Sequence, residues 1–305
     1  MIQYILKRLL QGLLTFLGIS IIVFLLGRAT GDPVRLIAPE GVTDEQREQI
    51  RISLGLDRPI HIQYWDFITG AVQGDFGHSF ISRQSVNSMI ASTLPNTLRL
   101  AFAAFGIAVL VSVPIGIFVA VKRNTIWDLL GNFFALTGQA MPNFWLALML
   151  MLIFSVNLGL LPISGSETPA HMILPAFALS LQSIGYFTRM TRSSMLEILG
   201  QEYIRTARGK GVGEFLVVCK HALKNAFIPI ITVMGIQFGH MLSGAIVIET
   251  VFAWPGLGRL AVTALFGRDF AVIQGVILVS TTIFVLVNLL VDILYTMVDP
   301  RIRIE

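Results

Sequence analysis

The sequence has little charge and almost no cysteine. Only 13% of its 305 residues are charged, about half of the ~25% that is usual in globular chains, whereas 54% are hydrophobic. So few charges cannot solvate the surface of a soluble protein, and so much hydrophobicity excludes disorder. The single cysteine, Cys219, excludes a scaffold of internal disulfides. With a mean hydropathy of +0.76, the composition indicates an integral membrane protein.

Motifs for catalysis and for metal or nucleotide binding are also missing. Gly209-Lys210 lacks the upstream glycine and the following Ser or Thr of a phosphate-binding loop. There is no His-Glu-x-x-His and no Gly-x-Ser-x-Gly. The five histidines are scattered without metal spacing. We therefore expect no catalytic residue, metal site or cofactor in this chain, and no ATP hydrolysis by the chain alone.

Six apolar segments are long enough to cross a bilayer, which needs about 20 residues as helix. They are residues 9–27, 100–121, 129–156, 172–188, 227–248 and 272–291. The third contains Pro142, which predicts a kink or a tilt. The fold predicted from these runs is an all-α integral membrane protein with six transmembrane helices.

Basic residues gather in alternate loops. They lie before the first segment, in the 2–3 loop, in the 4–5 loop and in the tail, as in Lys7, Arg8, Lys122, Arg123, Arg301 and Arg303. The 3–4 loop (157–171) has no Lys or Arg. The positive-inside rule then places both termini in the cytoplasm. The net charge of +4 is a topology signal, so we expect contact with the lipid membrane and no nucleic-acid partner.

These signals divide the chain into an N-terminal transmembrane helix (1–27), an extracytoplasmic segment (28–96), a domain of five further helices (97–295) and a cytoplasmic tail (296–305). In the outer segment, Thr43 and Gln46 have the spacing of a capping box for a helix reaching Leu54, and Gly55 follows as a stop. Residues 60–72 form a second amphipathic stretch. The outer segment is either a small cap on the outer helix ends or a surface that meets substrate or a delivery protein.

The 4–5 loop (189–224) is charged and helix-prone around 195–199 and 203–208. Gly209, Gly211 and Gly213 interrupt it before a helical pattern resumes at Glu214. Such a segment is either a rigid docking element for a partner or a solvated loop that obeys the positive-inside rule.

Polar residues within the spans mark a candidate solute route. In the fifth span, Gln237, His240 and Ser243 accompany three glycines. This small, polar face either lies beside the translocation pathway or serves only helix packing. The amides Gln139, Asn143 and Gln182 also fall at membrane depth, which suggests a polar seam suited to a hydrated solute.

The 4–5 loop resembles a known cytoplasmic motif. Residues 202–211 read Glu-Tyr-Ile-Arg-Thr-Ala-Arg-Gly-Lys-Gly, and His221-Ala222-Leu223-Lys224-Asn225-Ala226 follows. This pattern resembles the coupling loop of permeases of binding-protein-dependent ABC importers, whose general form is Glu-Ala-Ala, three residues, Gly. Arg205, Thr206 and Ala207 occupy the first three positions and Gly211 the glycine. The acidic first residue is absent, as in the peptide/nickel subfamily.

Further segments that resemble this subfamily extend from end to end of the chain. They are 5–9, Gly31-Asp32-Pro33, 54–59, 74–79, 94–97, 251–258 and 298–301. The resemblance is to B-type permeases of dipeptide, oligopeptide or glutathione importers.

The resemblance implies a type I ABC importer permease fold in a bacterial inner membrane. It implies a second homologous permease, two cytoplasmic ATPase subunits that bind the ATP and Mg²⁺, and an extracytoplasmic solute-binding protein. The ATPase-coupling residues would be Arg205, Thr206, Ala207, Gly209 and Gly211. Two alternatives are a membrane-bound enzyme, which the missing catalytic residues disfavour, and an ion-coupled secondary transporter that works without ATPase subunits.

Overall fold

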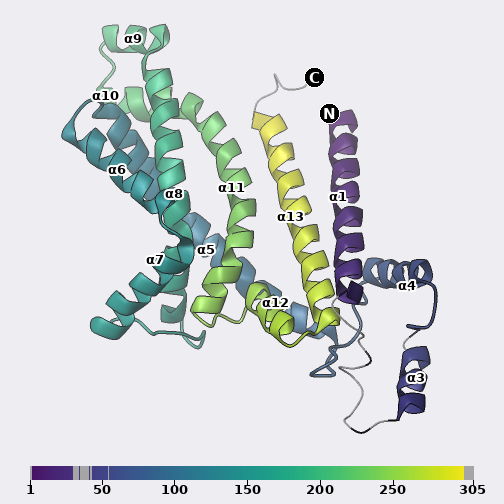
Figure 1. The fold of residues 1–305 in the computed structure, drawn as a ribbon. Helices are drawn as coiled ribbons and strands as arrows, with labels where there is room; N and C mark the ends of the chain where they lie inside the picture. The colour runs from purple at the N-terminus through teal and green to yellow at the C-terminus, as the bar shows by residue number, and fades with distance from the viewer. Residues whose placement is uncertain (1, 30–33, 35–40, 42, 54, 299–305) are drawn as a thin grey trace. The chain divides into compact units, whose positions relative to one another are not determined.

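A computed structural model of the chain describes residues 2–29, 34, 41, 43–53 and 55–298. The Gly31-Asp32-Pro33 motif, Leu54, Arg301 and Arg303 lie outside the described residues. The described chain is helical and contains no β-strand. Its elements are α1 (Ile2–Ala29), α3 (Asp44–Ser53), α4 (Ile60–Val72), α5 (Val86–Val121), α6 (Ile126–Ala140), α7 (Asn143–Leu150), a π-helix η1 (Met151–Asn157), α8 (Ala170–Leu199), α9 (Glu202–Gly209), α10 (Glu214–Leu216), a π-helix η2 (Val217–Ala222), α11 (Leu223–Val251), α12 (Leu257–Phe266) and α13 (Phe270–Val298) (Figure 1).

The six predicted spans are present. Within the described residues, α1, α5, α8, α11 and α13 each contain a stretch long and apolar enough to cross a bilayer, and α6 with α7 forms a sixth span when the bent pair is counted as one. The helices are longer than the apolar runs that predicted them. The fourth span, expected to close at Thr188, continues to Leu199 in α8, because a helix need not end where its charged residues begin.

The predicted kink at Pro142 is a sharp break. The axes of α6 and of the helix after it differ by 104°. Met141 and Pro142 have extended backbones, with ψ of 137° at both residues. Pro142 has no N–H for an intrahelical bond, and its ring disfavours the helical conformation in the preceding residue. Its carbonyl starts the next helix by accepting the N–H groups of Trp145 and Leu146, both at 3.1 Å.

The chain divides into two compact units, and α5 and α13 contribute to both. Among the described residues, one unit holds 97–254 and 287–298. The other holds the described residues between 2 and 96 together with 255–286.

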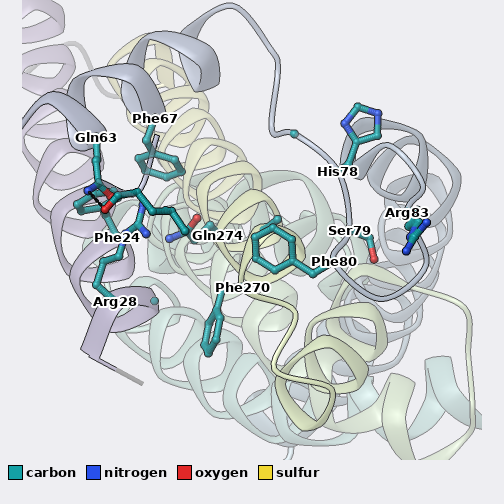
Figure 2. A pocket seen from close by; sticks show the side chains of 14 residues that line it. Phe24, Arg28, Gln63, Phe67, His78, Ser79, Phe80, Arg83, Phe270 and Gln274 are labelled. Atoms are coloured by element: carbon teal, nitrogen blue, oxygen red, sulfur yellow. Dashed lines mark hydrogen bonds between the residues drawn. The ribbon is translucent and has the colours of Figure 1, made fainter. Parts of the chain in front are cut away.

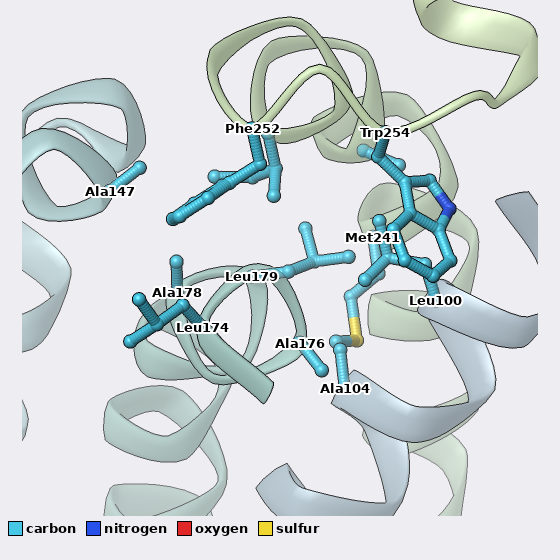
Figure 3. Close-up of a cluster of buried hydrophobic side chains, with 12 residues drawn as sticks. Leu100, Ala104, Ala147, Leu174, Ala176, Ala178, Leu179, Met241, Phe252 and Trp254 are labelled. Atoms are coloured by element: carbon cyan, nitrogen blue, oxygen red, sulfur yellow. The ribbon is translucent and has the colours of Figure 1, made fainter. Parts of the chain in front are cut away.

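The first unit has a core of closely packed small and aliphatic side chains. One cluster combines residues of α5, α7, α8 and α11 with Phe252 and Trp254 (Figure 3). A second cluster, around Phe187 and Met195 of α8, reaches α9, η2 and α11. Helices α6 and α8 touch at Gly185, where an added Cβ would lie 2.3 Å from the Ala135 carbonyl oxygen. Glycine is required there because the two backbones meet directly.

In the second unit, α4 packs against the end of α1. The hydroxyls of Ser20 and Tyr64 share a hydrogen bond of 2.8 Å. The ring of Phe24 lies 5.4 Å from that of Tyr64 and 5.6 Å from that of Phe67. Within the amphipathic stretch predicted for residues 60–72, Tyr64 and Phe67 therefore contact α1, whereas Ile60 and Val72 are exposed.

The capping box predicted for α3 is also present. The Thr43 hydroxyl accepts the Gln46 N–H at 3.3 Å, and the Gln46 side-chain oxygen accepts the Thr43 N–H at 3.1 Å. Gly55 has φ of +64° and ends the helix, as expected for a residue in the left-handed region.

Candidate functional site

The segment with the coupling-loop pattern folds as an amphipathic helix, α9, which lies at the end of α8 (Figure 1). Ile204 is fully buried in the cluster formed with Val217 and Ala222 of η2. Glu202 stands in the first turn and Arg208 in the last, where each charge complements the helix dipole. One side of α9 is thus fixed to the chain, and the other is free of it.

Two polar contacts hold α9 in place. The Asn225 amide donates to the Tyr203 hydroxyl at 2.8 Å. Arg208 donates two hydrogen bonds to the Glu214 carboxylate, at 3.0 and 2.6 Å, and so spans the glycine-rich turn. These hydrogen bonds raise the pKa of Arg208 above its ordinary value. Since the pair is about half exposed, it adds little to the stability of the fold. Its main effect is to fix the position of the turn after α9.

Gly211 ends the element with a left-handed turn. Its φ is +80°, and two backbone bonds close the turn, from Val212 N to Ala207 O at 3.2 Å and from Gly211 N to Arg208 O at 2.9 Å. This is the Schellman pattern, in which glycine is strongly favoured. The glycine assigned to the coupling motif therefore has a local role in shaping α9.

The structure divides the five predicted coupling residues into two groups. Arg205, Thr206 and Gly209 are exposed on the outer side of α9. Ala207 is partly buried against the chain's own cluster, and Gly211 forms the turn. A docked partner would meet the first group directly, whereas bulk at Ala207 would first disturb the chain's own packing.

The predicted pathway residues lie on one face of α11. His240 and Ser243 are exposed and Gln237 is partly exposed, whereas Ile230 and Met234 are buried. Among the described residues, His240 has no hydrogen-bonding or ionic partner.

Sequence reasoning missed two contacts that bring α6 and α8 together. Arg192 donates to both oxygens of Asp128, at 2.7 and 2.9 Å. Arg189 donates to the side-chain oxygen of Gln139 at 2.9 Å. Neither pair is close in sequence, so no local pattern reveals it.

The second unit contains a cavity of about 600 Å³ between α1, α4, the 77–83 loop and the start of α13. Figure 2 shows Arg28 and Gln63 near one another and Arg83 beside Ser79 and Phe80. The lining is mainly aromatic and aliphatic, with Phe24 and Phe270 contributing rings. This cavity was not foreseen from the sequence.

Over about two thirds of its length, the chain has the fold of known importer permeases. The chain superimposes on a structure of the inward-facing MetNI methionine ABC transporter with a TM-score of 0.59, at 18% identity, covering 69% of this chain and 96% of that one. An amino acid ABC transporter structure gives a TM-score of 0.53 at 18% identity, over 69% of this chain and 94% of the other. The fold is therefore the type I ABC importer permease fold.

Sequence relatives extend over nearly the whole chain. The glutathione transport system permease protein GsiC of Salmonella typhimurium is 47% identical over 304 residues, which are 99% of each chain. The GsiC protein of Escherichia coli K12 is 45% identical over the same share. Residues 1–101 match the N-terminal component of binding-protein-dependent transport system membrane proteins. Residues 112–304 match the binding-protein-dependent transport system inner membrane component, and the chain belongs to this family of multi-pass inner-membrane permeases.

Proposed function

We propose that this chain is one of two permease subunits of an ATP-driven importer for glutathione or related small peptides. The identity of 47% along the whole chain with a glutathione permease carries this proposal. The polar face of α11 supports it, because a solute with several charges and amides needs a route that lipid does not line. The chain would form half of that route and would have no enzymatic activity itself.

The proposed assembly draws its energy from two cytoplasmic ATPase subunits. The fixed geometry of α9, with Arg205, Thr206 and Gly209 exposed, supports docking in a groove of an ATPase. ATP and Mg²⁺ would bind in those partner subunits, and no cofactor would bind to this chain. Closure of the ATPases would then move the permease pair between two states as rigid bodies.

Solute would arrive from an extracytoplasmic binding protein on the side of residues 28–96. The distribution of Lys and Arg supports this orientation, with both termini and α9 in the cytoplasm. Selectivity among glutathione, dipeptides and longer peptides would then rest largely with the binding protein.

Uptake in proteoliposomes tests the proposal. The permease pair, ATPases and binding protein would be reconstituted together and given labelled glutathione. We expect uptake that requires ATP, the binding protein and all subunits. Uptake that proceeds on an ion gradient without ATPase subunits would overturn the proposal in favour of a secondary transporter.

A further inference from the structure

On either side of the break between α6 and α7, a polar side chain is paired with α8, and the two pairs lie two turns apart on that helix. Arg189 of α8 donates to the Gln139 side-chain oxygen at 2.9 Å. On the other side of the break, the Asn143 amide donates to the Gln182 side-chain oxygen at 3.2 Å. We call these four residues the amide–arginine cluster. Gln182 and Arg189 are exposed on α8, and Gln139 and Asn143 are half-buried against it.

The two pairs differ in depth along α8. At 1.5 Å per residue, Gln182 is about 18 Å from the first residue of α8 and so lies inside the span, whereas Arg189 is about 28 Å from it, near the inner edge of an apolar core about 30 Å thick. An exposed amide at the depth of Gln182 is expected to face a protein interior or a water-filled route and not hydrocarbon.

The cluster has hydrogen-bonding capacity that its own members do not use. The Gln139 amide nitrogen and the Asn143 side-chain oxygen are buried and have no hydrogen-bond partner. A guanidinium has five N–H donors, and Arg189 uses one of its terminal nitrogens for Gln139. No acidic side chain pairs with Arg189 among the described residues. The charge of Arg189 is thus uncompensated within this part of the chain.

Arg192, one turn further along α8, differs from Arg189 because its charge is neutralised by a carboxylate. It donates two hydrogen bonds to Asp128, and Asp128 also accepts from Asn132 at 2.8 Å. The two arginines share a helix and an apolar context, but only Arg192 has a carboxylate. Arg189 therefore has its charge and its remaining N–H donors available to an anion.

We propose that the amide–arginine cluster is a carboxylate-binding station on the solute route, with Arg189 providing the charge and Gln139 and Gln182 the neighbouring amides. This assignment rests on the proposed function, because a peptide-like solute supplies the carboxylate. A single contact of this kind would bind an anionic solute weakly. A site with many contacts would retain the solute.

The test measures local anion preference without using uptake. In the assembled transporter in nanodiscs of zwitterionic lipid, with Cys219 replaced by serine and no other reactive cysteine, Gln182→Cys would be modified by methanethiosulfonate reagents of opposite charge. We expect the anionic sulfonate reagent to be favoured over the cationic trimethylammonium reagent, and the ratio of their rates to fall about tenfold with Arg189→Gln. Phe266→Cys, at an exposed position of α12, is the control whose ratio should not change.

Two results would overturn the proposal. One is an unreactive Gln182→Cys both with and without ATP, since a solute route must be hydrated. The other is a rate ratio that Arg189→Gln leaves unchanged. If Arg189→Gln does not assemble, Gln139→Glu tests the same point by placing a carboxylate beside Arg189, and it should abolish the preference. Failure of glutathione uptake would refute the proposed function and leave this ratio measurable, so the two failures are distinguishable.

Discussion

Single residues decide how closely the helices of the first unit approach. Gly185 is the sharpest case, because a Cβ would lie 2.3 Å from the backbone oxygen of Ala135. A backbone atom cannot rotate away, so α6 and α8 would have to separate. Gly106 of α5 is a helical glycine with nothing within 4 Å of its Cβ position.

We therefore expect Gly185→Ala to destabilise the chain by about 1–3 kcal/mol and to lower the thermal midpoint of the purified complex. Gly106→Ala should be neutral or stabilising by up to about 1 kcal/mol, since it removes a flexible residue from a helix. Thermal unfolding of the two variants, compared with the parent, measures the difference. Equal midpoints would contradict the close α6–α8 contact.

Two of the ion pairs in the first unit, Arg192–Asp128 and Arg208–Glu214, differ in burial, and this predicts that they differ in their contribution to stability. Asp128 is about nine-tenths buried, whereas Glu214 is about half exposed. Removing Asp128 would leave the Arg192 guanidinium without its carboxylate in a poorly hydrated place.

We expect Asp128→Ala to cost on the order of 2–3 kcal/mol, and Glu214→Ala less than about 1 kcal/mol. The same thermal assay checks the order of the two variants. A larger fall in the thermal midpoint with Glu214→Ala would show that the turn after α9 contributes more to stability than the Arg192–Asp128 pair between α6 and α8.

In α9, the residues exposed for docking differ from those that the fold of the chain requires. Gly209 is exposed, lies in a helical conformation and has nothing within 4 Å of its Cβ position. The chain itself therefore tolerates a side chain there. Gly211 differs, because its φ of +80° strains any L-residue regardless of a partner.

We expect Gly209→Trp to leave membrane insertion and thermal stability unchanged and to reduce ATP-driven uptake at least tenfold, because the new ring occupies the docking face. Gly211→Asn is the control for the turn, since Asn tolerates the left-handed region better than most residues, and it should retain most of the uptake. Normal uptake by Gly209→Trp would remove the docking role from this face of α9.

Local patterns predicted the elements well and the long-range contacts poorly. The capping box of Thr43 and Gln46 and the aromatic face of α4 are properties of neighbours in sequence, so periodicity revealed them. The full length of α8 was missed because Arg189 and Arg192 end its apolar run. Their partners Gln139 and Asp128 are 50 and 64 residues away. The size of the bend at Pro142 likewise depends on packing that a lone proline does not specify.

The candidate site shows the same division. The helix-prone pattern around residues 203–208 predicted α9, and Gln237, His240 and Ser243 predicted a polar face of α11, on which His240 and Ser243 are exposed. These patterns did not show that Ala207 faces the chain's own core, because α9 is oriented by Ile204 against η2, a contact between separate elements.

At the scale of the whole molecule, orientation in the membrane follows from the loops. Basic residues are concentrated in the 2–3 and 4–5 loops and absent from residues 157–171. Long loops are poor guides to topology, so residues 28–96 carry no weight in this argument. From the short loops alone, we predict that α3 lies on the outer side and η2 on the inner side.

Two exposed positions report this orientation directly. Gln49 is exposed on α3, and the native Cys219 is exposed on η2. In intact spheroplasts, Gln49→Cys should react with a membrane-impermeant maleimide while Cys219 stays unlabelled until the membrane is opened. The parent chain, which has only Cys219, is the matched control. Labelling of Cys219 in intact spheroplasts, with Gln49→Cys protected, would invert the topology and place α9 on the side opposite to any cytoplasmic ATPase.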